Sequence, residues 1–390
     1  MYVNIGSLLI FLLIIFILFK IKNLPNINFY KEYINLCKKL LRLYPEEKEQ
    51  NESPFFSICI PVYNMEKYIY ISIFTVLNQS FRDFEIVIIN DFSLDNTENI
   101  IKNLQYNNPK IRLINHKENF GIYRSRVDAI KNSKGKFIIF LDPDDLFPNP
   151  DFLRDLYEYN LINNIDIIEY TVLMQNENRN RIYYSLDHRI NHFHNFNEEI
   201  IYHDHLSNIL FFENNHYSDV FCRCIWNKMV RKEVFNKTIH FLGNRAYEKD
   251  HFDFGEDTII NILNFEFASN YSNLNLVGYL YNFRDNSISH AKEGKEIQLK
   301  LGLSAFFFYK LFYKYVKYFN KDLNYLYFDI KAFDYYIDYI KQFSSNSNTK
   351  QSVIYFYKSL LKENNISSEF KEYAKQFIIN FNKNPIKKYK

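Results

Sequence analysis

Apolar positions follow two alternating patterns from residue 55 onward. Four short runs of mostly apolar residues have the length of buried strands, at 56–61, 84–90, 111–115 and 137–142. Between these runs the apolar residues recur at helical spacing, at 66–77, from about 94, and at 121–132. Strands that alternate with helices form a parallel sheet covered by helices on both faces. This part of the chain is therefore predicted to be an α/β domain.

Beyond residue 151 the pattern is less regular. It predicts a helix, a strand near 166–173, and a polar segment from about 175 to 200 that contains many Asn and His residues. Such a segment is either an acceptor-binding loop or an insertion without a binding role. Residues 295–390 have mostly helical spacing and are rich in Phe, Tyr and Lys. They predict an amphipathic helical region that either covers the sheet domain or contacts a membrane surface.

The N-terminal run, residues 2–19, contains no charged side chain and just reaches the length of a membrane-spanning helix. No basic segment precedes it and no small-residue cleavage site follows, so we expect a retained anchor rather than a signal peptide. Lysines follow the run and none precedes it, which by the positive-inside rule predicts a single-pass protein with its main domain in the cytoplasm. The alternative is a domain in the lumen of the Golgi or ER, where the acceptor sequon Asn236–Thr238 would be usable.

A polar stretch separates this anchor from the sheet domain. Residues 45–54, PEEKEQNESP, follow a short helical segment at about 30–43 and mark a boundary. The sequence thus predicts four parts, which are an anchor at 1–22, a stalk at 23–54, an α/β domain at 55–294 and a helical region at 295–390.

Composition narrows the class of protein. With 390 residues, of which 47% are hydrophobic, the chain can bury a large core. A formal charge of +3 is small for this length and gives no reason to expect a nucleic-acid partner. Four cysteines, Cys37, Cys59, Cys222 and Cys224, are too few for a disulfide scaffold, and the last two lack the usual spacing of zinc ligands.

Carboxylates gather where the predicted strands end. Asp142, Asp144 and Asp145 lie at the end of the run 137–142, and Asp91 follows the run 84–90. An open α/β sheet binds ligands at the carboxyl ends of its strands, and hard oxygens suit Mg or Mn. The cluster indicates nucleotide phosphate chemistry, although Asp and Pro also form turns and Asp caps helices. Asp91 is placed to accept a hydrogen bond from a nucleobase N–H.

This series of motifs resembles the family 2 glycosyltransferases of the GT-A fold. The matching segments are FSICIPVYNMEKYI, LNQSF, FEIVIINDFSLDNT, GIYRSR, FIIFLDPDDLFPNPDFL, IWNKMVRKEVF, FGEDTIIN and YNFRDNSIS. They cover about residues 55 to 290 and leave out the anchor, the stalk and the last hundred residues. The resemblance implies a Rossmann-like, mostly parallel sheet in the catalytic domain and an inverting transfer from a nucleotide-sugar donor.

The resemblance also implies which residues bind the donor. Pro61 and Tyr63 would flank the uracil or other base, and Asp91 would bind a ring nitrogen of that base. Asp142 or Asp144 would hold the ribose, and the two overlapping registers of the DPDD segment leave both open.

A divalent cation, Mn or Mg, is implied beside the diphosphate. Asp144 and Asp145 are the matched metal ligands, and His290 could complete the site or be an ordinary solvated or core histidine. Arg126 and Arg284 could bind the diphosphate, since guanidinium groups pair well with phosphate, or each could form a surface ion pair. Lys228 is a further candidate of this kind.

The catalytic carboxylate implied by the resemblance is Asp257. It would deprotonate the acceptor hydroxyl as that oxygen attacks the anomeric carbon, with inversion. Its neighbour Glu256 could raise the pKa of Asp257 by like-charge repulsion. The same pair could simply cap the helix that follows, and both roles are compatible.

Two departures from the family pattern concern the donor site. Asn90 precedes Asp91 where the family commonly has Asp, and residues 125–129, SRVDA, stand where it commonly has Ala-Arg-Asn-x-Gly. These changes bear on donor affinity or identity. Trp226 could stack on an acceptor sugar or belong to the core.

The predicted function is a membrane-anchored, metal-dependent glycosyltransferase that moves a sugar from a nucleotide-linked donor to a hydroxyl of a glycan, protein or lipid. We expect the donor to be UDP-linked. One alternative is a polyprenol-phosphate sugar synthase, which the anchor and the basic C-terminus would fit. Another is a non-catalytic sugar-nucleotide-binding protein held at a membrane. The four carboxylates Asp142, Asp144, Asp145 and Asp257 favour an enzyme over this last possibility.

Overall fold

The computed structural model describes residues 53–176, 181–184, 200–202, 224–243, 255–283, 295–321, 347–364 and 366–382. The predicted anchor at 1–22 lies outside this part of the chain, as do almost all of the stalk at 23–54 and most of the polar segment at 175–200. Arg284 and His290 also lie outside it. Within the described residues, no helix combines the length and the apolar character that a bilayer crossing requires.

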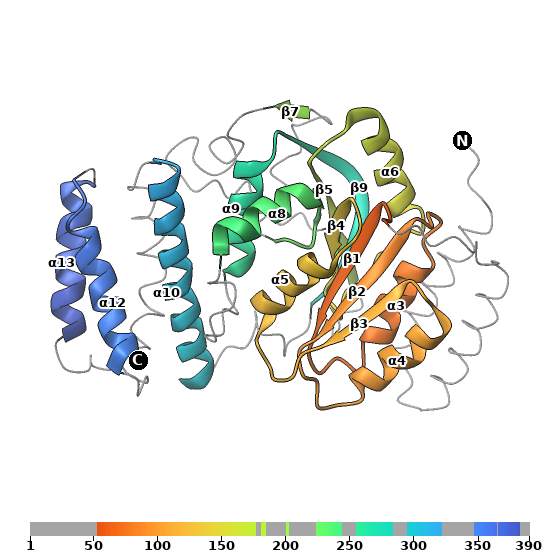
Figure 1. The fold of residues 1–390 in the computed structure, drawn as a ribbon, viewed down its shortest axis with the longest axis horizontal. Coiled ribbons are helices and arrows are strands. Elements are labelled where there is room, and N and C mark those ends of the chain that lie inside the picture. Colours follow the sequence, from red (N-terminus) through yellow and green to blue (C-terminus); the bar gives the residue numbers. More distant parts are fainter. Residues whose placement is uncertain are drawn as a thin grey trace.

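The first half of the domain is a parallel sheet, as the sequence predicts (Figure 1). Its strands run in the order β3-β2-β1-β4, so the chain starts in the middle, moves outward and then returns to the other side. Phe56 of β1 pairs with Phe84 of β2 and with Phe137 of β4. The strands are β1 (Phe56–Val62), β2 (Phe84–Asn90), β3 (Ile111–Asn115) and β4 (Phe137–Phe140).

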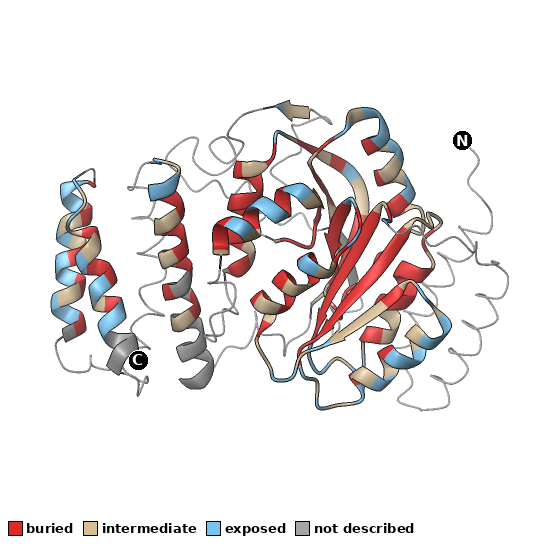
Figure 2. Ribbon diagram, viewed as in Figure 1, coloured by how far each residue is buried: buried red, intermediate tan, exposed pale blue. Residues whose placement is uncertain are grey.

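Three helices connect these strands and cover the sheet. α3 and α4 lie on one face and α5 on the other, as expected for right-handed crossovers when the direction of strand addition reverses (Figure 1). Every residue of β1, β2 and β4 is buried, which explains why these strands are apolar at consecutive positions (Figure 2). The helices are α3 (Ile69–Leu77), α4 (Thr97–Asn107) and α5 (Ile122–Asn132).

The second half extends the sheet with mixed strand directions. β8 lies between β4 and β5 and is antiparallel to both, while β5 and β9 are parallel. The remaining short strands, β6 and β7, pair with β5 and β9. The elements are α6 (Phe152–Asn163), β5 (Ile167–Asn176), β6 (Arg181–Tyr184), β7 (Ile200–Tyr202), β8 (Lys228–Arg231), α8 (Lys232–Leu242), α9 (Glu256–Phe267) and β9 (Asn270–Phe283).

Helices follow the sheet domain, in agreement with the helical spacing after residue 295. α10 packs against α9, and Tyr315 donates a hydrogen bond to the buried carboxylate of Glu266 at 3.0 Å. α12 and α13 pack against each other, and the stacked rings of Tyr357 and Phe377 lie between them. The helices are α10 (Lys295–Tyr318), α12 (Ser347–Leu360) and α13 (Ser368–Asn382).

Gly135, in the turn before β4, allows the chain to pass directly over β1. Its N–H donates to Ser57 Oγ at 2.8 Å, and a Cβ at this position would lie 2.5 Å from the backbone nitrogen of Ser57. Because backbone atoms cannot move aside, we expect Gly135→Ala to lower the free energy of unfolding by about 1–3 kcal/mol. Urea denaturation measures this, with exposed Lys134→Ala as the control that should change stability by less than about 0.5 kcal/mol. Equal stability of the two variants would contradict the close approach.

Candidate active site

Asp91 and Asp142, two of the predicted donor residues, lie at the carboxyl edge of the parallel sheet. Leu141, directly after β4, donates its N–H to Cys59 of β1 at 3.0 Å, and Asp91, directly after β2, donates its N–H to Val62 of β1 at 2.9 Å. These bonds hold the two strand ends on either side of β1. The edge therefore presents Asp91 on one side and Asp142 on the other, as parallel strand order requires.

Asp91 is almost completely buried, with 3% of its surface exposed. Its Oδ1 accepts the Phe120 N–H at 2.9 Å and lies 2.7 Å from Nδ1 of His116, and its Oδ2 accepts the Gly121 N–H at 2.8 Å. Gly121 has a φ of 84°, a conformation that favours glycine. Asp91 thus holds the turn that leads into α5.

Pro61 and Tyr63, the two residues predicted to flank the base, differ in how far they are exposed. Pro61 is buried within β1, opposite Ile89 of β2. Tyr63, which follows the last residue of β1, is 41% exposed, so its ring is accessible at the edge of the sheet. Asn64 adopts a φ of 52° and turns the chain toward α3.

Asp145 is fully buried and is anchored to β9. Its Oδ2 accepts the Tyr279 hydroxyl proton at 2.7 Å, and its Oδ1 accepts the Asn282 N–H at 2.7 Å. Tyr279 in turn accepts the N–H of Asp142 at 3.1 Å. Burial, together with the charges of Asp144 and Asp142, raises the pKa of Asp145 well above its usual range. Asp145 therefore fixes the DPDD loop, while Asp142 and Asp144 remain partly exposed.

Arg126 of α5 joins the two sides of the site. This guanidinium is 3% exposed and contacts Glu256 Oε1 at 2.5 Å, the carboxylate of Asp257, and Asp142 Oδ1 at 3.4 Å. Its Nε is buried and has no hydrogen-bond partner among the residues that the structure describes. The structure thereby brings together Asp142 after β4 and Asp257 at the start of α9, which are 115 positions apart in the sequence.

The charged groups in this cluster shift one another's pKa values. Burial raises the pKa of Asp142 to about 6; Arg126 opposes this rise, while Asp144 and Asp257 add to it. Burial alone would lower the pKa of Arg126, but the carboxylates of Asp257, Asp142 and Glu256 outweigh it, so the guanidinium stays charged. Within the described residues, the Arg126 guanidinium thus contacts three carboxylates.

Asp257 lies in the first turn of α9, which begins after Gly255 at a φ of 82°. Carboxylates are favoured there because the amino end of a helix is electropositive. The second oxygen of Asp257 is 3.5 Å from the N–H of Ile225, and its side chain is 21% exposed. Asp257 is therefore both a first-turn acid of the helix and a carboxylate accessible from the site.

Two residues at or just before the start of β8 are part of the core. Trp226 is 7% exposed and stacks on Tyr279 and Tyr281. Lys228 is 1% exposed, and its Nζ bonds to the Cys224 carbonyl and to Asn227 Oδ1 and lies 3.6 Å from Glu169. Burial thus favours the core alternative for Trp226, and it removes Lys228 from the diphosphate candidates.

Two residues that sequence reasoning missed support the site. Tyr279 comes from the middle of an aromatic strand, and nothing in its neighbourhood distinguishes it from the other tyrosines. His116 follows β3 at the same sheet edge as Asp91, so its position after a strand was an available signal.

The residues at this edge fit a divalent cation that is shared with a substrate. Within the described residues, no three His, Cys, Asp or Glu side chains are arranged to hold a metal on their own. Asp142 and Asp144, however, supply two hard oxygen donors whose mutual repulsion contributes to the raised pKa of Asp142. Mg²⁺ is commonly bound by one or two carboxylates together with substrate phosphates. Such a cation would relieve this repulsion.

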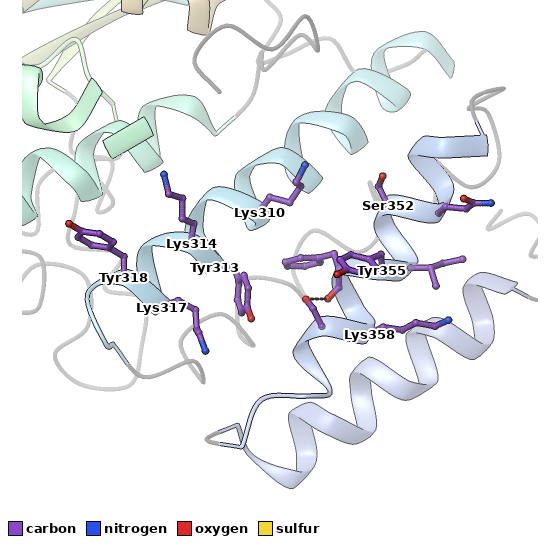
Figure 3. A pocket seen from close by; sticks show the side chains of 12 residues that line it. Lys310, Tyr313, Lys314, Lys317, Tyr318, Ser352, Tyr355 and Lys358 are labelled. Atoms are coloured by element: carbon purple, nitrogen blue, oxygen red, sulfur yellow. Dashed lines mark hydrogen bonds between the residues drawn. The ribbon is translucent and has the colours of Figure 1, made fainter. Parts of the chain in front are cut away.

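A separate cleft of about 1260 Å³ lies between α10 and α12 (Figure 3). Tyr313 and Tyr355 lie between the helices, but the nearby cations are used in packing. Lys317 pairs with Glu363 at 2.7 Å, and Lys314 donates to the Phe241 carbonyl at 2.5 Å. We therefore place the chemistry at the sheet edge and assign none to this cleft.

Comparison with known proteins agrees with this geometry. Residues 57–239 match the profile described as Glycosyl transferase family 2. The chain is 40% identical over 110 residues to the hyaluronan synthase of Pasteurella multocida, which is 28% of this chain and 11% of that protein. It is 28% identical over 238 residues to the uncharacterized glycosyltransferase EpsJ of Bacillus subtilis, covering 60% of this chain and 63% of the relative. The chain thus spans less than two thirds of either relative.

A solved structure shares the fold. TarS of S. aureus in complex with UDP-GlcNAc superposes with a TM-score of 0.51 at 17% identity, covering 84% of this chain and 88% of that one. A match at this identity concerns the fold alone.

Proposed function

We propose that this chain transfers a sugar from a UDP-linked donor to an acceptor hydroxyl. Its residues 57–239 match the family 2 glycosyltransferases. The observation that carries the proposal is the position of Arg126, whose one guanidinium contacts both Asp142 of the donor side and Asp257 of the acceptor side. A single buried cation between these carboxylates marks the place where the diphosphate and the acceptor would meet.

The donor would lie along the carboxyl edge of the sheet. Asp91 would accept the ring N–H of the base, and the exposed ring of Tyr63 would cover one face of it. Asp142 or Asp144 would accept hydroxyl protons of the ribose, since both are partly exposed beside the strand end. Arg126 would contribute positive charge near the diphosphate.

Asp257 would act as the base. Its carboxylate would take the proton of the acceptor hydroxyl while the oxygen forms its bond to the anomeric carbon and the bond from that carbon to the diphosphate breaks. The nucleoside diphosphate leaves with the bonding electrons, so the anomeric centre is inverted. Arg126 contacts the Asp257 carboxylate, and phosphate oxygens would compete for that guanidinium.

Asp142 and Asp144 would hold the divalent cation that this fold implies, and His290 and Arg284 stay as predictions for the same region. When bound, Mg²⁺ or Mn²⁺ supplies positive charge that stabilises the leaving diphosphate. Asp145 is better suited to fixing the loop, because both of its oxygens accept hydrogen bonds from β9.

The donor class is supported by the likeness of the fold to a protein solved with UDP-GlcNAc. The acceptor is a glycan, protein or lipid hydroxyl. We further propose that residues 1–22 anchor the enzyme in a membrane with the catalytic domain in the cytoplasm, where a luminal orientation is the alternative.

A nucleotide screen tests the donor class. The full chain with Mn²⁺ is heated in the presence of UDP, GDP, CDP or no nucleotide. A ligand that binds only the folded state raises the midpoint of unfolding, by about 2.7 kcal/mol of stability at a hundredfold excess over Kd. We expect UDP to stabilise the protein most. Stabilisation by GDP alone would identify GDP, and not UDP, as the nucleotide of the donor. If no nucleotide stabilises the protein, the proposal is contradicted.

Replacing Asp144 tests the cation. Asp144→Asn should weaken the Mn²⁺-dependent part of UDP binding, because it removes one of two charged oxygen donors, and UDP affinity without metal should change little. Calorimetric titration with and without EDTA separates the two parts. Asp151→Asn, which changes an acid at the start of α6, is the matched control. Undiminished metal dependence in Asp144→Asn would exclude Asp144 as a ligand.

A further inference from the structure

His116 connects two carboxylates behind the proposed base site. Its Nδ1 is 2.7 Å from Asp91 Oδ1, and its Nε2 is 3.1 Å from Asp128 Oδ2. All three side chains are largely shielded, with exposed fractions of 8% for His116, 5% for Asp91 and 15% for Asp128. The ring of Phe120 packs edge-on against the imidazole, with 5.1 Å between the ring centroids.

This geometry requires the charged form of the histidine. A neutral imidazole has one nitrogen without a proton, and that nitrogen would face a carboxylate oxygen on either side. The two carboxylates outweigh burial and raise the pKa of His116 to about 9. Arg124 also donates to Asp128 Oδ2, at 2.6 Å, so His116 and Arg124 are the cations that contact this pair of acids.

The consequence lies in the hydrogen-bonding capacity of Asp91. A carboxylate oxygen accepts about two hydrogen bonds. Oδ1 already accepts from His116 and from the Phe120 N–H, whereas among the described residues the donor to Oδ2 is the Gly121 N–H. One accepting position therefore remains, on Oδ2. Since each donor to Asp91 is fixed in place, that position has a defined direction.

We propose that His116 is a positioning residue for the donor nucleotide, which orients Asp91 so that its remaining Oδ2 position accepts the ring N–H of a nucleobase. This inference rests on the proposed function and extends it to base selection. Because the position can only accept, it selects bases that carry a ring N–H at their pairing edge, such as uracil, over cytosine, whose ring nitrogen there is itself an acceptor.

Two neutral replacements of His116, by Asn and by Gln, test its contacts with Asp91 and Asp128 one at a time. An Asn amide nitrogen can occupy roughly the place of Nδ1, which faces Asp91, and a Gln amide nitrogen roughly that of Nε2, which faces Asp128. Calorimetry at pH 7.5 with Mg²⁺ measures the affinity of the full chain for UDP and CDP. This pH keeps His116 charged and lies well below the pH at which the ring N–H of uracil dissociates.

We expect His116→Gln to weaken UDP binding about 10- to 100-fold, the effect of losing one hydrogen bond to a charged group, and His116→Asn to weaken it less. The affinity for CDP should change little in either variant. The kcat of UDP-sugar hydrolysis should stay near wild type at saturating donor while KM rises, because the polar contacts found for His116 within the described residues are with Asp91 and Asp128 and not with Asp257.

Other outcomes would overturn the inference. Equal loss in the Asn and Gln variants, or a parallel loss of UDP and CDP affinity, would indicate a merely structural histidine. Wild-type affinity in all variants would remove His116 from the donor site while leaving the proposed function intact. Failure of the wild-type chain to bind UDP would overturn the donor class and this inference together.

Discussion

Asp257→Asn is expected to reduce sugar transfer by about 10²- to 10⁴-fold, the range for loss of a general base, while UDP affinity stays within about threefold of wild type. The carboxamide keeps the shape of the side chain but cannot take a proton from the acceptor. Arg126 retains Glu256 and Asp142 as partners in this variant, so the donor side is preserved. UDP released from UDP-GlcNAc, with water as acceptor, measures turnover, and calorimetry with UDP measures binding.

The control for this experiment is Glu233→Gln. Glu233 is an exposed acid in the first turn of α8, so its replacement removes the same favourable charge from a helix amino end without touching the site. We expect unchanged turnover. If Asp257→Asn also turns over at the wild-type rate, Asp257 is a helix-terminal acid and another group is the base.

Arg126→Met is expected to abolish donor binding and to lower the free energy of unfolding by about 3–5 kcal/mol, the range for breaking a buried ion pair. The methionine fills similar space, but it removes the positive charge that Arg126 places beside Glu256, Asp257 and Asp142. Urea denaturation of the full chain gives the stability change. Arg154→Met is the control, because Arg154 is half exposed and its contact with Asp151 is 3.9 Å long, so about 0–1 kcal/mol should be lost.

The pH dependence of this loss identifies its cause. Burial already raises the pKa of Asp142 to about 6, and removing Arg126 removes the charge that opposes this rise. A raised carboxyl pKa costs stability at pH values above it, and protonation removes that cost as the pH falls. The deficit of Arg126→Met should therefore shrink between pH 7.5 and pH 5. A deficit that is equal at both values would point to lost packing instead of unpaired charge.

The parallel half of the fold follows from the sequence. The strands at 84–90 and 111–115 have the predicted limits, because each is a mostly apolar run that ends at a polar residue, Asn90 or Asn115. The first helix begins at Ile69 rather than at 66, since residues 63–68 form turns after β1. The antiparallel insertion of β8 between β4 and β5 was not predicted, because strand order depends on pairings between distant segments that periodicity does not encode.

The sequence places several candidate residues at one edge of the sheet, but it does not give the contacts between them. The strand-end position of Asp91 and Asp142 follows from parallel topology. The pairing of Arg126 with Asp257 does not, since it joins residues 131 positions apart. The sequence also leaves Asp144 and Asp145 equivalent, and only the contacts with Tyr279 and Asn282 distinguish the buried carboxylate from the accessible one.

The central claim is that a UDP-linked donor lies along the carboxyl edge of the sheet, between Asp91 and the DPDD loop. A crystal structure of the chain with UDP and Mn²⁺ tests it most directly. The account predicts a uracil N–H within hydrogen-bond distance of Asp91 Oδ2, and a diphosphate beside Arg126 with its metal on Asp142 or Asp144. UDP bound away from this edge, or bound there with its base remote from Asp91, would contradict it.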